Sequence, residues 1–217
     1  MRRAILIVAL AVPATASAHF KLVAPEGMYS QSGLGDPQKE GPCGPTGDGG
    51  ATTNQVTTVM AGSTLTLTIN ETIYHPGHYR VAIAQNPAGL PAVPTVTPGT
   101  TACGSAPIEA NPTLPLLADG VLKHTSAFSG QQTAQIALPA DMACTNCVVQ
   151  VVEFMSNHPA PCFYYHCAVV NVTAGPGGTP DAGMTPGDDH GGGCSTGGGV
   201  GLGAAVALLF LAQRRRS

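Results

Sequence analysis

The residues with the most specific chemistry in this chain are three histidines. His19 directly follows Ala16-Ser17-Ala18, a small-residue triplet typical of signal-peptide cleavage, and His75 and His78 share one Tyr-His-Pro-Gly-His-Tyr segment. A histidine at a free amino terminus offers a metal ion both its α-amine and an imidazole nitrogen, and one further imidazole completes a T-shaped set of three nitrogens. Copper(II) prefers tetragonal nitrogen or oxygen ligation. We therefore expect one copper ion, held by His19 and by either His75 or His78.

The segment before His19 has the features of a secretion signal. Arg2 and Arg3 lead, an apolar core spans residues 4–12, and the small-residue triplet ends at Ala18. We predict that residues 1–18 are a signal peptide and that the protein is exported. Because cleavage creates the α-amine of His19, the uncleaved precursor should lack the metal site.

The end of the chain predicts a linker followed by an anchor. Residues 175–193 are largely Gly, Pro, Asp and Thr, a composition that buries too little apolar surface to fold. Residues 194–217 contain Cys194, a short apolar stretch and terminal arginines, and they resemble the C-terminal surface-sorting signal of myxobacterial proteins. That resemblance implies processing near Cys194; the alternative is a simple membrane anchor. Both interpretations place the protein outside the cytoplasm, at the cell surface, associated with the outer membrane, or extracellular.

Charge and composition exclude some classes of function. A formal net charge of −3, with only 10% charged residues, provides no basic field to hold nucleic acid. The 28 glycines and 19 prolines fit an exported, loop-rich β protein better than a cytosolic helical one. Residues 19–174 amount to one domain of roughly 150 residues. We expect a monomer whose function resides in a local site.

Short β-branched and aromatic runs predict an all-β fold. Residues 63–70 alternate cleanly, with Leu65, Leu67 and Ile69 on one face and threonines on the other. Similar runs lie at 20–24, 55–60, 79–85, 133–138, 148–155 and 163–173. About seven strands with turn punctuation predict an immunoglobulin/fibronectin-III-like antiparallel β-sandwich. The segments 27–51 and 86–117 are too long for hairpin turns and are expected to be ordered loops.

Six cysteines within the predicted domain indicate disulfides in an exported protein. They are Cys43, Cys103, Cys144, Cys147, Cys162 and Cys167. The sequence leaves their pairing open, but Cys43 and Cys103 are placed to tie down the two long loops. The Cys144-Thr-Asn-Cys147 spacing also occurs in zinc and redox sites. Because no second C-x-x-C accompanies it and the compartment is oxidising, we interpret it as structural.

Three motifs resemble the copper "histidine brace" of lytic polysaccharide monooxygenases. They are His19-Phe20-Lys21-Leu22, His75-Pro76-Gly77 and Phe163-Tyr164-Tyr165-His166-Cys167. The domain is still more similar to a myxobacterial polysaccharide monooxygenase-like group, whose members share HFKLVAP, GDPQK and HPGHYR.

The resemblance implies a role for several residues. In the fungal cellulose-active enzymes the second brace histidine is followed by any residue and a glycine, a pattern that fits His75 better than His78. A tyrosine three residues before a disulfide cysteine occupies the axial side of the copper, which implies that role for Tyr164. Cys162 stands where the fungal pattern has a glutamine, and His158 and His166 are the candidates for its outer-sphere histidine.

Two functions are compatible with these residues. In the first, the protein is an enzyme that uses copper and an external electron donor to cleave chitin, cellulose or another glycan oxidatively. In the second, it is a non-catalytic copper carrier that exchanges the ion with a donor or acceptor. Periplasmic carriers of the CopC type also begin with histidine after the signal, on a small sandwich, and the opening HFKLVAPEG resembles theirs. The longer domain, the six cysteines and the FYYHC segment favour the enzyme.

Overall fold

The computed structural model of the chain describes residues 19–45 and 50–175. The predicted signal peptide, the anchor with Cys194 and nearly all of the predicted linker lie outside these residues. Eight strands and one short 3-10 helix occur in the described part: β1 (His19–Ala24), β2 (Val56–Met60), β3 (Thr64–Ile73), β4 (Gly77–Ala84), η1 (Pro87–Gly89), β5 (Leu116–His124), β6 (Gln132–Ala137), β7 (Cys144–Met155) and β8 (Phe163–Thr173). No helix among these residues is long and apolar enough to cross a membrane.

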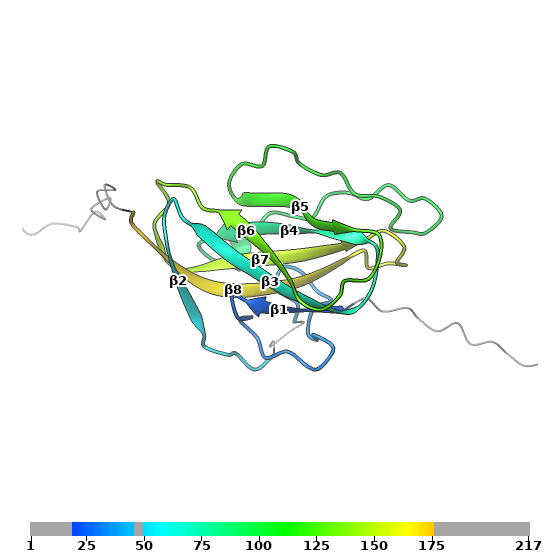
Figure 1. Cartoon of the computed structure of the whole chain (residues 1–217), viewed down its shortest axis with the longest axis horizontal. Helices are drawn as coiled ribbons and strands as arrows, with labels where there is room; N and C mark the ends of the chain where they lie inside the picture. The colour runs from blue at the N-terminus through cyan, green and yellow to red at the C-terminus, as the bar shows by residue number, and fades with distance from the viewer. Residues whose placement is uncertain (1–18, 46–49, 176–217) are drawn as a thin grey trace, which may run out of the picture. The chain divides into compact units, whose positions relative to one another are not determined.

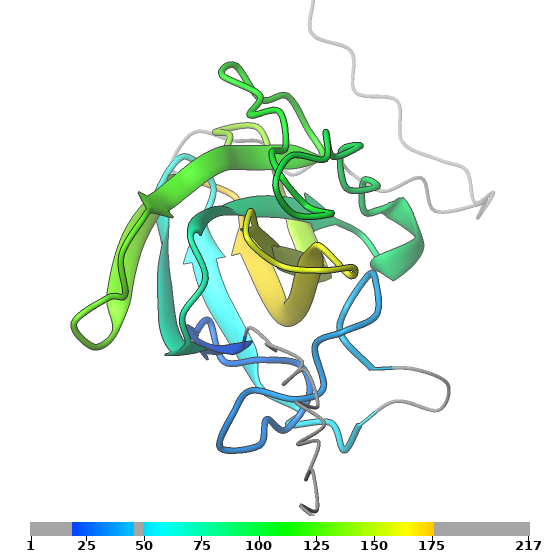
Figure 2. The same cartoon turned by 90° about the vertical axis from the view of Figure 1, so that its right-hand side faces the viewer.

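The strands form two sheets that confirm the predicted all-β sandwich. One sheet has the order β1-β3-β6, and the other has the order β2-β8-β7-β4-β5. β3 and β6 cross in front of the larger sheet in Figure 1, and Figure 2 shows the same layers from one end. All neighbouring strands are antiparallel except β2 and β8, which run parallel. The larger sheet is therefore mixed rather than wholly antiparallel.

The hydrophobic pattern of each strand explains its place in the sandwich. In β3, Leu65, Leu67 and Ile69 are buried while Thr64 and Thr66 are exposed, as the alternation predicts. In β7, residues 147–155 are all buried, because β7 is paired on both sides and covered on both faces. The main core lies between the sheets, where the β3 side chains meet valines of β7 and β8.

β5 is a strand that the sequence pattern does not predict. Its centre contains Asp119 and Gly120, which are poor strand formers, and Gly120 and Leu122 both have positive φ angles. The pairing of β5 with β4 shifts register repeatedly as a result. The loop expected over 86–117 therefore ends at Pro115, and an irregular edge strand follows it.

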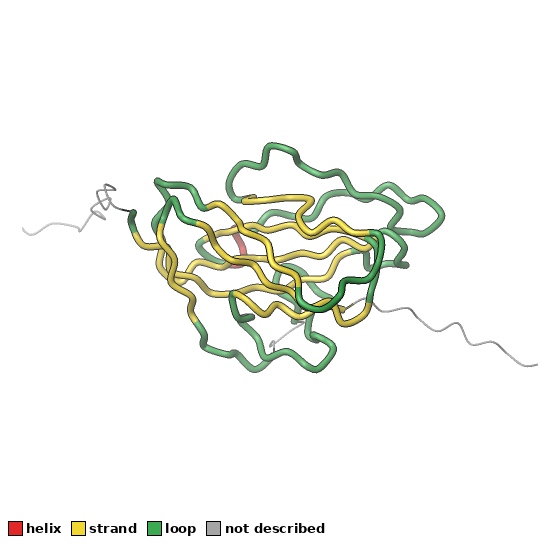
Figure 3. Tube along the Cα trace, in the orientation of Figure 1, coloured by secondary structure: helices red, strands yellow, loops and turns green. Residues whose placement is uncertain are grey.

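The six domain cysteines form three disulfides, as predicted. Cys43 pairs with Cys167, Cys103 with Cys162, and Cys144 with Cys147. The first joins the loop after β1 to β8, and the second joins the loop before β5 to the connection between β7 and β8. Both long loops are therefore anchored, as expected. These loops stand out in green in Figure 3.

Candidate metal centre

His19 is the first residue of β1 and is fixed through its backbone. It lies opposite Ile73 in the antiparallel pair of β1 and β3, and the Thr72 hydroxyl donates a hydrogen bond to the His19 carbonyl at 3.0 Å. The next residue, Phe20, is fully buried between the sheets. The pairing of β1 with β3 shifts register between His19 and Phe20, and the His19 side chain is itself buried. The start of β1 is thus held by the core, and His19 is presented at the end of the sandwich.

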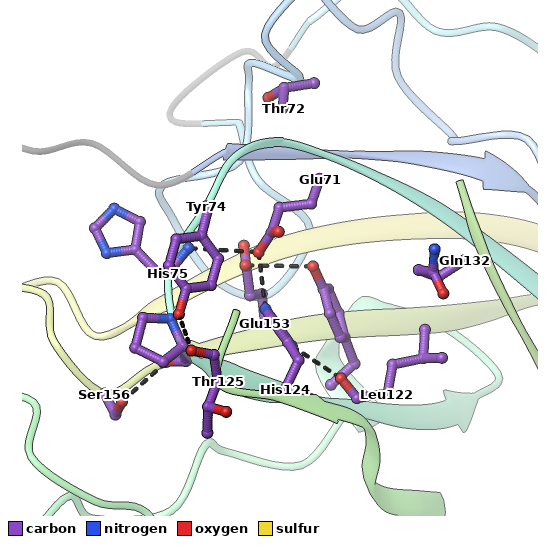
Figure 4. A network of polar contacts seen from close by, with 12 residues as sticks. Glu71, Thr72, Tyr74, His75, Leu122, His124, Thr125, Gln132, Glu153 and Ser156 are labelled. Carbon is purple, nitrogen blue, oxygen red and sulfur yellow. Dashed lines mark hydrogen bonds and ion pairs between the residues drawn. The ribbon is translucent and has the colours of Figure 1, made fainter. Parts of the chain in front are cut away.

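His75 lies in the short connection between β3 and β4. Because His19 pairs with Ile73, His75 follows the partner of His19 by only two residues. The backbone N–H and hydroxyl of Ser156 both donate to the Pro76 carbonyl, at 2.8 and 2.9 Å. The Tyr74 hydroxyl donates to the Thr125 carbonyl at 2.5 Å. Contacts to two other segments therefore fix the turn that positions His75 (Figure 4).

The buried carboxylate of Glu71 also contacts this turn. Its Oε1 accepts from the His75 backbone N–H at 3.4 Å and lies 2.9 Å from Nε2 of His124. Burial opposes protonation of His124, but hydrogen bonds to Glu71 and to the Leu122 carbonyl raise its pKa overall. Beyond Glu71, the Tyr79 hydroxyl donates to Glu153 (Figure 4), and burial together with the Glu71 charge raises the pKa of Glu153 well above its usual range. The neutral form of Glu153 is therefore favoured beside the contact of Glu71 with His124.

Gly77 is required where the turn enters β4. A Cβ at this position would lie 1.7 Å from the Phe154 carbonyl oxygen, closer than any side chain permits. Only glycine lets β4 pair with β7 at Met155 immediately after the histidine turn. The glycine of the His-Pro-Gly motif thus has a packing reason that is independent of any ligand.

Four rings from three parts of the chain meet at this end of the sandwich. The Tyr164 ring centroid lies 5.7 Å from that of His19 and 5.9 Å from that of His158. The His158 ring lies 4.9 Å from that of His75. All three contacts are edge-to-face. We call the cluster of His19, His75, His158 and Tyr164 the histidine end.

Hydrogen bonds select particular nitrogens of the two candidate ligands. Nδ1 of His75 lies 2.6 Å from Oδ1 of Asn157. Since an amide oxygen only accepts, Nδ1 carries the proton and Nε2 has the lone pair that a metal needs. Burial lowers the pKa of His75, and the nearby His158 and His19 lower it further, so the neutral ring is favoured. Nε2 of His19 lies 3.2 Å from Oδ2 of Asp36, and Nδ1 is the ring nitrogen that can share a metal with the α-amine.

Asp36 reaches His19 from the long loop that follows β1. Gly35, with a φ of +110°, lets this loop pass close to the Phe20 carbonyl, which a Cβ there would approach to 2.0 Å. The side-chain Oε1 of Gln38 then accepts a hydrogen bond from the Phe20 N–H at 3.1 Å, and the backbone carbonyl of Gln38 accepts one from the Tyr165 N–H at 2.8 Å. Asp36 and Asn157 are not among the site residues predicted from the sequence. The GDPQK motif contains Asp36 and was the available signal for it.

The other predicted site histidines occupy different positions. His78 turns toward Asp119, 3.7 Å away, and packs on Phe154, so it lies outside the ring cluster that contains His75. His166 is buried, and its Nε2 donates to the Phe20 carbonyl at 3.0 Å. Burial lowers the pKa of His166 to about 4, so this ring is a neutral link between the two sheets. His158 is the histidine that lies beside both His75 and Tyr164.

No group of three or more His, Cys, Asp and Glu side chains among residues 19–45 and 50–175 is arranged to hold a metal ion. A brace draws only two side chains from these residue types, since its third nitrogen is an α-amine. The tautomer of His75 and the Asp36 contact at Nε2 of His19 both fit such a set.

Comparison with protein-family models, curated proteins and solved structures finds no match for the chain.

Proposed function

We propose that the exported protein, cleaved after Ala18, binds one copper ion through the α-amine and Nδ1 of His19 and through Nε2 of His75. The observation that carries this proposal is the convergence of His19 and His75 on the linked rings of Tyr164 and His158. The hydrogen bond of Asn157 to the opposite nitrogen of His75 supports it, because outer partners of this kind fix the tautomer of metal-binding histidines.

We infer further that this site oxidises glycans such as chitin or cellulose, with electrons from an external donor. Copper supplies one-electron chemistry with dioxygen or peroxide, which is the chemistry that oxidises a glycosidic C–H bond. His158 donates from Nδ1 to the Pro159 and Pro161 carbonyls, which fixes the orientation of this ring beside His75. Tyr164 lies on the His19 side of the cluster and would limit access of further ligands there.

A copper carrier of the CopC type is the alternative, and one observation favours it. Cys162, at the position where the fungal pattern has glutamine, is bonded to Cys103 and provides no amide donor. The outer groups that manage reduced oxygen species are therefore different in this chain. In either role we propose that the protein is at the cell surface, associated with the outer membrane or extracellular, and that its anchor segment is processed near Cys194.

Copper binding is tested with protein that begins at His19, compared with a form that has one additional alanine before His19. The first should bind one copper(II) with a nitrogen-rich tetragonal EPR spectrum, and the second should lose most of the affinity because its α-amine is displaced. His75→Ala should also lose most of the affinity, while His78→Gln, the matched control, should bind normally. Normal binding by His75→Ala would exclude the brace as drawn.

Catalysis is tested separately by incubating the copper-loaded protein with chitin, cellulose or xylan and ascorbate. Mass spectrometry should detect oxidised oligosaccharides, and His158→Gln should reduce their yield while leaving copper affinity unchanged. The absence of oxidised products on every glycan, with copper binding intact, would favour the carrier.

A further inference from the structure

The Cys144–Cys147 disulfide differs from the other two in its position and in the length of chain that it closes. It joins residues only three apart, whereas the other two disulfides join residues 124 and 59 apart. It lies at the first residues of β7, and the histidine end lies near the last ones. We call the start of β7, with Cys144 and Cys147, the cysteine end.

Two cavities open beside this disulfide. One, of about 580 Å³, is lined by both cysteines together with Gln85, Leu114, Pro115 and Met142, among others. A second, also of about 580 Å³, is lined by Cys144 and by Asn171 and Val172 of β8. Cys144 borders both cavities and is partly exposed, whereas Cys147 borders only the first and is 2% exposed. We therefore expect a reagent to attack the sulfur of Cys144 rather than that of Cys147.

The backbone around the disulfide is held by contacts that do not involve sulfur. Cys144 and Cys147 pair with Val172 and Val170 of β8 across a bulge. Within the bulge, Asn146 has a φ of +55°, and its N–H donates to Oδ1 of Asn171 at 2.7 Å. Oε1 of Gln85 lies 3.6 Å from Sγ of Cys147, where it can accept a hydrogen bond from a thiol. The strand pairing can therefore persist when the disulfide opens.

We propose that Cys144–Cys147 is a thiol–disulfide exchange site that accepts two electrons from a dithiol entering these cavities. A thiolate of the dithiol attacks Sγ of Cys144, which forms a mixed disulfide and releases Cys147 as a thiolate that takes up a proton. The second thiolate of the dithiol then attacks the first sulfur of the dithiol in the mixed disulfide. The bond between that sulfur and Sγ of Cys144 breaks, and Cys144 is released as a thiolate that takes up the other proton. The dithiol is oxidised to a disulfide, and the protein gains two thiols.

The test exposes the folded, signal-cleaved protein to mixtures of reduced and oxidised dithiothreitol, followed by acid quenching, N-ethylmaleimide labelling and peptide mass spectrometry. Cys144 and Cys147 should be labelled at ratios that leave the other two disulfides intact, with the thermal unfolding transition still cooperative. Labelling of all six cysteines together, or of another pair first, would overturn the proposal. Cys144→Ser/Cys147→Ser should show no labelling under the same conditions.

The route of attack is tested with glutathione, whose first product with the protein is a mixed disulfide that acid quenching preserves. The adduct should form on Cys144, and an adduct on Cys147 would refute the assigned direction. Ala143 is exposed and lines both cavities, so Ala143→Phe should slow the reaction with dithiothreitol several-fold. Ala137→Phe, at an exposed position of β6 outside both cavities, is the matched control and should react at the original rate. An unchanged rate in Ala143→Phe would exclude entry through the cavities.

Discussion

The two ends of β7 are crosslinked in different ways. Two long-range disulfides serve the histidine end: Cys43, bonded to Cys167 opposite the middle of β7, ties down the loop that contains Asp36, and Cys103–Cys162 ties a second loop to the segment that contains Asn157 and His158. At the cysteine end, roughly 36 Å along the strand, one disulfide closes a loop within β7 itself. The long-range disulfides are thus placed where loops must hold side chains against buried histidines.

The two long-range disulfides have a structural role, whereas the proposed role of Cys144–Cys147 is chemical. A crosslink removes conformational freedom from the unfolded chain in proportion to the logarithm of the loop that it closes. The two long-range disulfides therefore stabilise the fold strongly, while the disulfide at the cysteine end contributes less. Because this disulfide contributes less to stability, opening it should leave the fold intact. It also borders two cavities through which a reagent can approach.

The largest expected effect is on stability, from removal of one long-range disulfide and, separately, of the disulfide at the cysteine end. Cys43→Ala/Cys167→Ala should lower the free energy of unfolding by about 5 kcal/mol, and Cys144→Ala/Cys147→Ala by about 2 kcal/mol, because the closed loops differ so much in length. Urea unfolding followed by circular dichroism measures both variants. Equal losses would show that loop length does not separate the two ends, and the structural distinction would fail.

The next effect is on the pH dependence of stability and concerns His166, which links β8 to β1. Its pKa is about 4 in the folded protein and near 6.5 in the unfolded chain, so the unfolded chain binds more protons between these values. Stability should therefore fall as pH decreases from 6.5 to 4, by about 3 kcal/mol from this residue.

His166→Gln isolates this contribution, because glutamine retains an N–H that can donate to the Phe20 carbonyl. The variant should lose less stability than the parent between pH 7 and pH 4.5 in metal-free urea unfolding. The pKa values of His75 and His78 are lowered in both proteins, so their contribution to the pH dependence of stability remains in the variant. Parallel pH profiles for the two proteins would contradict a buried, neutral His166.

The sequence predicts the regular part of the fold better than its irregular part. The alternation of β3 is visible because one face of that strand is buried and the other is exposed. β5 shows no such alternation, because Asp119 and Gly120 interrupt its apolar residues. Its position as a strand is set by pairing with β4 rather than by its own sequence pattern. Local pattern therefore identifies strands that alternate, and misses an edge strand that tertiary pairing imposes.

The site divides in the same way. His19, His75 and Tyr164 stand out through motifs in the sequence. Asp36 and Asn157 lie in loops without periodicity, and they reach the histidines only through folding of the chain and its long-range disulfides. A single sequence does not show which loop carboxylate or amide will contact a given imidazole.

The smallest expected effect concerns copper affinity and rests on the proposed metal site. Asn157→Ala removes the acceptor for Nδ1 of His75, so the ring loses its fixed tautomer and orientation, and copper affinity should fall by about tenfold or more. Asn171→Ala removes the corresponding asparagine contact at the cysteine end and is the matched control. Competition titration against a copper chelator measures both variants. A fall confined to Asn157→Ala would place the proposed metal site at the histidine end, because the control loses a hydrogen bond of similar length without touching an imidazole. Equal falls would instead mean that asparagine loss acts through general loosening of the larger sheet.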